Sequence, residues 1–334
     1  MEVSLTDAAI AFEKMNHRLQ LPACFDPVYL LIDAKRDSAL CPTFFVYEEQ
    51  GELFYHGFHL AQVPNTIFFD IQSPYGYGGP ISTSKDQEFL KRAWQEYGIF
   101  CKKSNVIAEF IRFHPLLQNW QYYQGEAIVN RETVYVNLEA EDLIATYAEN
   151  RVRTAVRKGA KNGVQVSLSS REFFLDHFKE LYRDSMQRMQ TSDFYLFNDE
   201  YIDNLCSWEK SFLVVAKYEE RVLTVLLGLI NGEILELHLF GSSVESNKLC
   251  ATNLIYHEAF LMAKEKGCCI AHFGGGNSND EQDPLFFFKL GFSKKTAEYR
   301  IGKFIHKPEI YKNMAESWER KMGRKVTRIL FYRD

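Results

Sequence analysis

The chain has 334 residues, of which 46% are hydrophobic and 25% charged, and its formal net charge is −5 at pH 7. This composition is typical of a globular protein with a full core, and the acidic balance argues against a DNA-binding protein. No apolar run is long enough to span a membrane, and residues 1–19 carry acids where a signal peptide would have a basic segment. We therefore expect a cytoplasmic protein with two ordinary domains or one large domain.

Seven cysteines are scattered along the chain without a Cys-x-x-Cys pair. Cys268 and Cys269 are adjacent, a spacing that suits neither an ordinary disulfide nor a tetrahedral metal site. His56 and His59 have no company that predicts a metal site, so a structural or surface role is favoured for both. We expect reduced thiols and no metal ion.

The first half of the chain predicts a hairpin followed by an alternation of strand and helix. Residues 43–58 contain two strand-like runs joined by Glu49-Gln50-Gly51, which is typical of a β-hairpin. The elements expected next are a strand at 66–71, a glycine-rich loop at 71–80, a helix over 85–98 and a strand at 106–113.

The second half repeats this order. Its expected elements are strands at 211–218 and 221–230, a tight turn at Asn231-Gly232, a strand at 232–240, a loop at 241–250, a helix over 251–267 and a strand at 269–273. Gly98 and Gly267 are each expected to close a helix, and their separation equals that of Pro115 and Pro284. The shared order and spacing predict two copies of one domain.

The predicted fold class is α/β (α+β), with two tandem domains that each have a mixed, mostly antiparallel sheet flanked by helices. Strands that follow one another before any crossover helix predict a mixed sheet rather than a parallel one. This order resembles the acetyltransferase (GNAT) fold. We expect the domains to span residues 1–140 and 141–334, the second containing a basic helix over 150–161 near its start.

Five short motifs together resemble the FemAB/FemX peptidyltransferase-like family of double-GNAT proteins. They are YGYGGP (75–80), EFIRFHPL (109–116), RVRTAVRKGAKNGV (151–164), HFGGG (272–276) and DPLFFFKLGF (283–292). The resemblance covers roughly residues 40–305. It implies an acyltransferase that acts on an amine, and the family includes both enzymes that use aminoacyl-tRNA to modify cell-wall (peptidoglycan) precursors and presumed acyltransferases of surface polysaccharides.

The loop 71–80 has two interpretations. One is a proline-bracketed tight turn with inward tyrosines. The other is a substrate loop, because glycines permit close approach to a helix N-terminus, where phosphate binds readily. The resemblance favours acceptor binding, by Tyr75, Tyr77, Gly78 and Gly79.

The segment 151–161 is basic and contains no acid. Arg153 and Arg157 share a helix face, which is either a solvated surface or a site for a diphosphate or a tRNA backbone. The resemblance places this stretch beside the acceptor and implies that Arg153, Arg157 and Lys158 bind the phosphate of a phosphorylated small-molecule or lipid-linked acceptor.

The acyl donor is predicted to bind the second copy, at Ser242, Ser243, Asn247, Gly274 and Gly275. The loop 241–250 departs from the Gln/Arg-x-x-Gly-x-Gly/Ala pattern of ordinary acetyltransferases. Acetyl-CoA or another acyl-CoA and aminoacyl-tRNA therefore both stay open as donors.

Three residues are candidates for the chemistry. Strand alternation places Glu236 and His238 on the face opposite Leu235, Leu237 and Leu239, where either could take the proton of an attacking amine. The resemblance implies that Lys289 points to the transfer site and offsets charge on phosphate or an oxyanion.

The leading hypothesis is direct acyl transfer to an amine of a phosphorylated cell-envelope or nucleotide-sugar precursor, since no cysteine or serine has the context of a nucleophile. The competing hypothesis is a ligand- or partner-binding protein on a decayed GNAT fold. Residues 308–334 predict a helix followed by a strand, whose basic residues either touch tRNA or face solvent.

Overall fold

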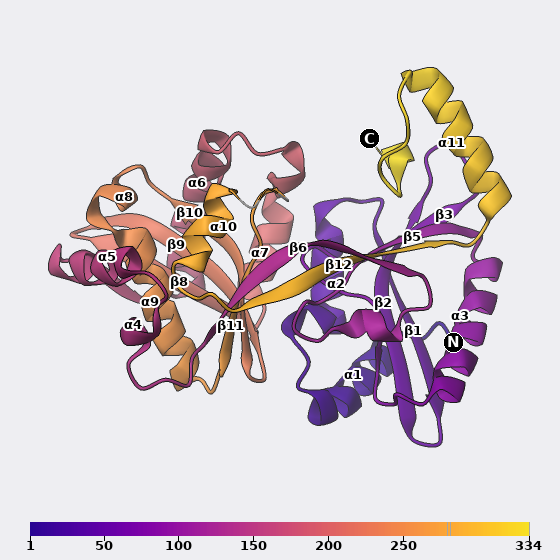
Figure 1. Cartoon of the computed structure of the whole chain (residues 1–334), viewed down its shortest axis with the longest axis horizontal. Coiled ribbons are helices and arrows are strands. Elements are labelled where there is room, and N and C mark those ends of the chain that lie inside the picture. The colour runs from indigo at the N-terminus through magenta and orange to yellow at the C-terminus, as the bar shows by residue number, and fades with distance from the viewer. Residues whose placement is uncertain (279, 281, 334) are drawn as a thin grey trace. The chain divides into compact units, whose positions relative to one another are not determined.

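The computed structural model describes residues 1–334 except 279, 281 and 334 (Figure 1). The chain forms two compact units. Unit 1 comprises Met1–Arg131 and Glu298–Asp334, and unit 2 comprises Glu132–Ala297. This division differs from the expected ranges 1–140 and 141–334, because the last segment of the chain returns to unit 1 as a strand and a helix.

Unit 1 contains a mixed sheet in the order β1-β2-β3-β5-β12. Only the β3–β5 pair is parallel among the neighbours whose register is described within this unit. The helices and strands of this unit are α1 (Leu5–Leu19), α2 (Pro27–Asp33), β1 (Cys41–Glu49), β2 (Glu52–Gln62), β3 (Phe69–Gln72), β4 (Ile81–Ser82), α3 (Gln87–Lys103), β5 (Val106–Arg112) and α11 (Pro308–Met322), with β12 (Thr296–Ile305) entering from unit 2.

The helix α3 covers one face of this sheet with an aromatic core that includes Phe45, Phe54, Phe58, Trp94 and Tyr97. Asp86 caps the start of α3, since its carboxylate accepts from the backbone N–H of Phe89 (2.8 Å). The helix continues to Lys103, so the prediction that Gly98 closes it is wrong.

Unit 2 contains a sheet in the order β6-β11-β10-β9-β8-β7, in which β10 and β11 are parallel and the other described pairs antiparallel. Its elements are β6 (Glu126–Asn137, which begins in unit 1), α4 (Leu143–Thr146), α5 (Asn150–Lys161), β7 (Gln165–Leu168), α6 (Arg171–Arg188), α7 (Asp199–Ser207), β8 (Ser211–Tyr218), β9 (Arg221–Asn231), β10 (Ile234–Ser242), α8 (Glu245–Leu249), α9 (Ala251–Glu265), β11 (Ile270–Gly274) and α10 (Pro284–Leu290). The predicted basic helix is present as α5.

Short 3-10 turns complete the chain: η1 (Ala23–Phe25), η2 (Ala34–Arg36), η3 (Asn119–Tyr122), η4 (Asp193–Tyr195) and η5 (Phe331–Arg333). The last of these replaces the strand expected after α11, and Arg333 there donates to the buried Asp70 (2.7 Å). Among the described residues, none of the helices combines the length and apolarity needed to cross a membrane.

Candidate functional site

The parallel strands β10 and β11 of unit 2 pair over a short stretch and then part. Their register runs from Ile234–Ile270 to Glu236–His272, whereas β10 continues to Ser242 alongside β9 and β11 continues to Gly274 alongside β6. The carboxyl ends of diverging parallel strands are a common ligand position in α/β sheets. Glu236 and His272 occupy the last paired positions before the strands separate.

Glu236 and His272 form a buried acid–imidazole pair, with Oε1 of Glu236 3.5 Å from Nδ1 of His272. The Thr133 hydroxyl donates to the carbonyl of Ala297 (3.1 Å), so its oxygen accepts from Nε2–H of His272 (3.1 Å). Since Nε2 carries a proton, any further proton lies between Nδ1 and the carboxylate. The pair can therefore accept one proton from a reacting group and hold it there.

His238 is the extra residue of a β-bulge in β10. The register shifts between Leu237, which lies opposite Gly228, and Leu239, which lies opposite Leu227. Nε2 of His238 lies 2.9 Å from the hydroxyl of the buried Tyr201 on α7. The bulge thus points an imidazole at α7 close to Glu236.

The bulge also changes which side chains face the core. Leu235 and Leu237 pack in the cluster beneath α9 as expected, but Phe240 rather than Leu239 is the next residue of β10 in that cluster. The predicted alternation of three leucines on one face is therefore wrong for Leu239, because the extra residue shifts the period of two.

Lys289 on α10 donates a hydrogen bond from its ammonium to the carbonyl of Gly275 (2.6 Å), just beyond the end of β11. Its Nζ also lies 5.6 Å from the ring centre of Phe273. Burial lowers the pKa of Lys289 to about 7, although the charge of Asp283 acts in the opposite direction. An amine that titrates near neutrality at a strand end is a candidate for function.

Asp283 fixes this region by bonding in two directions. Its Oδ1 accepts from the backbone N–H groups of Leu285 and Phe286 (both 2.9 Å) and so caps α10, while Oδ2 accepts from the backbone N–H groups of Asn277 and Ser278 (both 2.9 Å). One carboxylate therefore holds both Asn277 and Ser278 and the start of α10.

The predicted donor residues differ in their surroundings. The backbone of Ser242 bonds to the Ser185 hydroxyl through both its N–H (2.8 Å) and its C=O (3.1 Å). The hydroxyl oxygen of Ser243 is buried and has no hydrogen-bond partner in the part of the chain that the structure describes. Asn247 is exposed on α8, and Gly274 ends β11. Their role in donor binding stays a prediction.

The helix α9 begins beside the basic helix α5 (Figure 1). A Cβ added to Gly159 would lie 2.9 Å from the carbonyl oxygen of Cys250, so glycine permits this close approach. Cys250 provides no side-chain cap to α9. The first N–H groups of α9 and the exposed Arg157, Lys158 and Lys161 therefore offer positive potential in one region of unit 2.

Arg153 differs from its neighbours on α5. It is half-buried, and its guanidinium donates to the backbone carbonyl of Tyr147. Arg157 and Lys158 are exposed, and neither has an ion-pair partner among the described residues. The phosphate-binding prediction therefore fits Arg157 and Lys158 better than Arg153.

In unit 1 the backbone of Gly78 and Gly79 in the loop 71–80 is packed against neighbouring residues rather than exposed to a ligand. The backbone of Gly78 donates to the Arg112 carbonyl (2.7 Å) and accepts from the Asn119 amide (2.9 Å). Gly79 has φ +94°, and a Cβ there would lie 2.9 Å from Ile111. These contacts favour the turn interpretation for both glycines.

The loop also does not lead into an open helix N-terminus, because β4 intervenes and Asp86 caps α3. These two features do not favour a phosphate site at that helix, which stays a prediction. Tyr77 packs edge-on against His114 (ring centres 5.2 Å apart) and Tyr299 (5.7 Å), and it is half-buried like Tyr75. Acceptor binding by these tyrosines stays a prediction.

The buried carboxylate of Asp33 holds the loop 71–80 in place. It accepts from Arg36 (2.6 and 2.9 Å), from the backbone N–H of Tyr75 (3.1 Å), and contacts Nε2 of His59 (2.7 Å). Burial alone would raise the pKa of Asp33, but the His59 hydrogen bond and the Arg36 charge outweigh it and hold the pKa well below its usual range. His59 and His56 are both buried in β2.

We expect Asp33→Asn to lower the free energy of unfolding by about 3 kcal/mol, because it removes the buried carboxylate that pairs with Arg36 and His59. Urea unfolding at pH 7 measures this, with the exposed Glu13→Gln as control. Because the folded pKa is lowered, the Asp33 contribution is present above about pH 4 and is lost as pH falls. Equal stability of the two variants at pH 7 would contradict the prediction.

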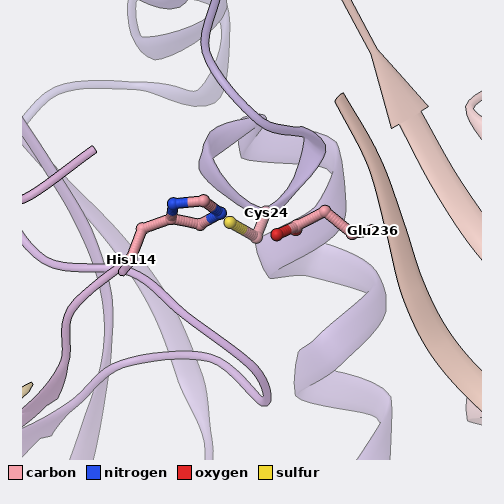
Figure 2. Close-up of side chains that lie close together, drawn as sticks. All are labelled: Cys24, His114 and Glu236. Atoms are coloured by element: carbon pink, nitrogen blue, oxygen red, sulfur yellow. The ribbon is translucent and has the colours of Figure 1, made fainter. Parts of the chain in front are cut away.

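Cys24 and His114 lie side by side in unit 1 (Figure 2), with sulfur and a ring nitrogen within 4.8 Å; Glu236, also drawn there, belongs to unit 2. The backbone N–H of Leu117 donates to Nδ1 of His114 (3.3 Å). The neutral ring therefore carries its proton on Nε2 and has no lone pair with which to activate the thiol. This geometry does not favour Cys24 as a nucleophile.

The sequence alone does not predict that His272, Thr133 and Tyr201 are partners of the candidate residues. His272 stood inside the HFGGG motif, but its pairing with Glu236 depends on the register of two parallel strands that 25 or more residues separate. The only available signal was the position of both residues near strand ends.

Residues 148–283 match the family model described as an acetyltransferase (GNAT) domain. The structure of FemX is similar to this one, with a TM-score of 0.72 at 15% identity, covering 94% of this chain and 99% of that chain. L-PGS from Bacillus licheniformis has a TM-score of 0.60 at 15% identity, covering 97% and 98%.

A tandem GNAT protein from the clavulanic acid biosynthesis pathway has a TM-score of 0.50 at 9% identity, covering 92% of this chain and 98% of that one. No match was found among curated protein sequences. The matched domain and the shared fold confirm the predicted fold class, the resemblance to FemX-like double-GNAT proteins and the acyltransferase class.

Proposed function

From its GNAT acetyltransferase domain and its FemX-like double-GNAT fold, we propose that this chain transfers an acyl or aminoacyl group directly onto an amine of a phosphorylated cell-envelope or nucleotide-sugar precursor. The observation that carries the proposal is the divergence of β10 and β11 at the Glu236–His272 pair, with Lys289 at the end of β11. A proton acceptor thus lies within residues 148–283, which match the acetyltransferase domain, and a cationic group lies just beyond them, both at the end of the parallel strand pair.

The reaction needs one proton acceptor and one group that stabilises negative charge. The amine nitrogen attacks the acyl carbonyl carbon, and its proton passes to Glu236 or His238. The carbonyl oxygen gains negative charge, which a protonated Lys289 stabilises. The bond to the donor then breaks, a C–S bond for an acyl-CoA or a C–O bond for an aminoacyl-tRNA ester, and the leaving group takes a proton.

We propose that the donor, rather than the acceptor expected from the resemblance, places its phosphates at the start of α9. Backbone N–H groups and the exposed Arg157, Lys158 and Lys161 supply the attraction there. Both acyl-CoA and aminoacyl-tRNA carry phosphates, so this region suits either donor.

The test is transfer of labelled acyl groups to amine-bearing precursors, with acetyl-CoA and aminoacyl-tRNA supplied separately. Product formed from one donor identifies it. Tight binding of both donors without turnover on any phosphorylated amine would overturn the proposal in favour of a binding protein on a decayed fold.

Charge reversal on α5 separates the two donors further. We expect Arg157→Glu combined with Lys161→Glu to weaken donor binding at least about tenfold, because each lost charged contact is worth about 1.5 kcal/mol or more. For a tRNA donor, the slope of log affinity against log salt should also become less steep.

Calorimetric titration measures this effect. The matched control is Lys266→Glu, an exposed lysine at the opposite end of α9. If the control lowers the donor affinity equally, the effect is one of general charge. If the double variant leaves the donor affinity unchanged, α5 is not part of the donor site.

A further inference from the structure

A second group of metal-ligating side chains is buried in unit 1 and shares no residue with the candidate acyl-transfer site. The thiol of Cys101, the carboxylate of Glu109 and a ring nitrogen of His306 have ligand atoms within 4.8 Å of one another. Cys101 and Glu109 are fully buried, and the His306 side chain is 10% exposed. The group is therefore enclosed but has one member at the surface.

Three elements of unit 1 bring these residues together. Cys101 lies on α3, one turn after Tyr97, so both side chains face the sheet. Glu109 lies on β5 opposite Phe304 of β12, and His306 directly follows β12, where its backbone N–H donates to the Ile107 carbonyl (2.9 Å). Phe304 and His306 are two residues apart, which places His306 on the face of Glu109.

The polar contacts of the group are incomplete. Nε2 of His306 lies 2.5 Å from Oε1 of Glu109, and the Tyr123 hydroxyl donates to Oε2 (3.2 Å). The Tyr97 hydroxyl is fully buried and lies within reach of Glu109 and Cys101, but no contact of it meets both the distance and the angle of a hydrogen bond among the described residues. The negative charge of Glu109 acts on both Tyr97 and Cys101, so these groups adjoin the same carboxylate.

A buried hydroxyl without a well-formed hydrogen bond is costly, so a further group at this point would stabilise the Tyr97 hydroxyl. Thiolate, imidazole and carboxylate together are the donor set of Zn²⁺ and similar borderline divalent ions. A thiolate and a carboxylate also neutralise a charge of +2 without any further residue. Neither the proposed acyl transfer nor the apolar packing of α3 explains why a cysteine, a glutamate and a histidine lie together here.

We propose that Cys101, Glu109 and His306 bind a divalent metal ion of the zinc class, with the Tyr97 hydroxyl directed at the same position. The ion takes the place of the direct hydrogen bond between His306 and Glu109, whose atoms are closer than two ligands of one tetrahedral ion. It links α3, β5 and the end of β12, so its role is to stabilise unit 1. Because the thiol must lose its proton, binding releases a proton.

The test uses the full chain, stripped with a chelator and titrated with Co²⁺ as a spectroscopic probe. We expect a near-ultraviolet thiolate charge-transfer band and visible bands of tetrahedral cobalt, together with a rise in Tm when Zn²⁺ is added. Cys101→Ser should lose the charge-transfer band, and Glu109→Gln should lower Co²⁺ affinity at least about tenfold.

Two other buried cysteines supply controls: Cys206→Ser and Cys24→Ser should keep the band. Absence of any thiolate band in the folded wild type would overturn the proposal, and this outcome does not depend on whether a variant folds. A band that survives Cys101→Ser but disappears in Cys24→Ser would overturn it as well, since it would place the metal elsewhere.

Discussion

Replacing Glu236 by Gln should lower kcat by about 10²- to 10⁴-fold, the range expected for loss of a general base. The amide keeps the size of the side chain but cannot take the proton of the attacking amine. Its partner His272 already has Nε2–H bonded to Thr133, so Nδ1 could only accept from the amide. Binding of the acyl donor should stay within about threefold of wild type.

Steady-state kinetics with the donor identified by the transfer assay measures this effect. The matched control is Glu233→Gln, an exposed carboxylate just before the same strand, which should leave kcat unchanged. If Glu236→Gln keeps its activity while His238→Ala loses it, the bulge histidine is the base. If both variants turn over normally, this strand does not supply the base.

Much of the fold could be predicted from the sequence because its signals are local. Hairpin turns, strand positions and the basic helix 150–161 depend on neighbouring residues, and the structure contains each of them. The resemblance also pointed to the correct fold, because its five motifs mark a loop, a strand end, the helix α5, the end of β11 and the helix α10 in the order that the fold keeps.

The remaining features depend on contacts between distant segments. Nothing local in residues 298–334 shows that β12 pairs with β5 and returns the chain to unit 1. The bulge at His238 follows from the register of β10 against β9, and a period of two read from the sequence cannot include it. The Glu236–His272 pair likewise appears only once the parallel register is fixed.

The glycine-rich loop shows how the same residues serve two purposes. Its composition suits both a tight turn and a phosphate site, and the choice depends on what its backbone groups meet. Gly78 bonds to Arg112 and Asn119, and Tyr75 bonds to Asp33, so the backbone is used to hold the loop. The exposed parts of its tyrosines remain as the surface that could meet an acceptor.

Lys289→Met should lower kcat/KM by about 10²- to 10³-fold, because it removes the cation proposed to stabilise the oxyanion. The pKa of Lys289 is lowered by burial to about 7, so the ammonium form predominates only below that pH. We therefore expect the wild-type kcat/KM to fall as pH rises through about 7. The kcat/KM of the Met variant should not show this fall.

The stability of the same variant gives an independent check with a defined sign. The folded pKa of Lys289 lies below the unfolded value of about 10.4, so the unfolded chain binds more protons between these values. Wild-type stability should rise with pH from about 7 towards 10, relative to Lys289→Met, and the Met variant should have its largest advantage below pH 7. The matched control is Lys294→Met, an exposed lysine nearby.

Lys289→Arg distinguishes a role for charge from a role for a neutral amine. Arginine stays protonated throughout the accessible range, so a variant that tolerates its size should keep activity above pH 7 and lose the descending limb. If activity instead rises with pH through about 7 in the wild type, the neutral amine is the working form. Lys289 would then act as the proton acceptor, and Glu236 would be left with the task of holding His272.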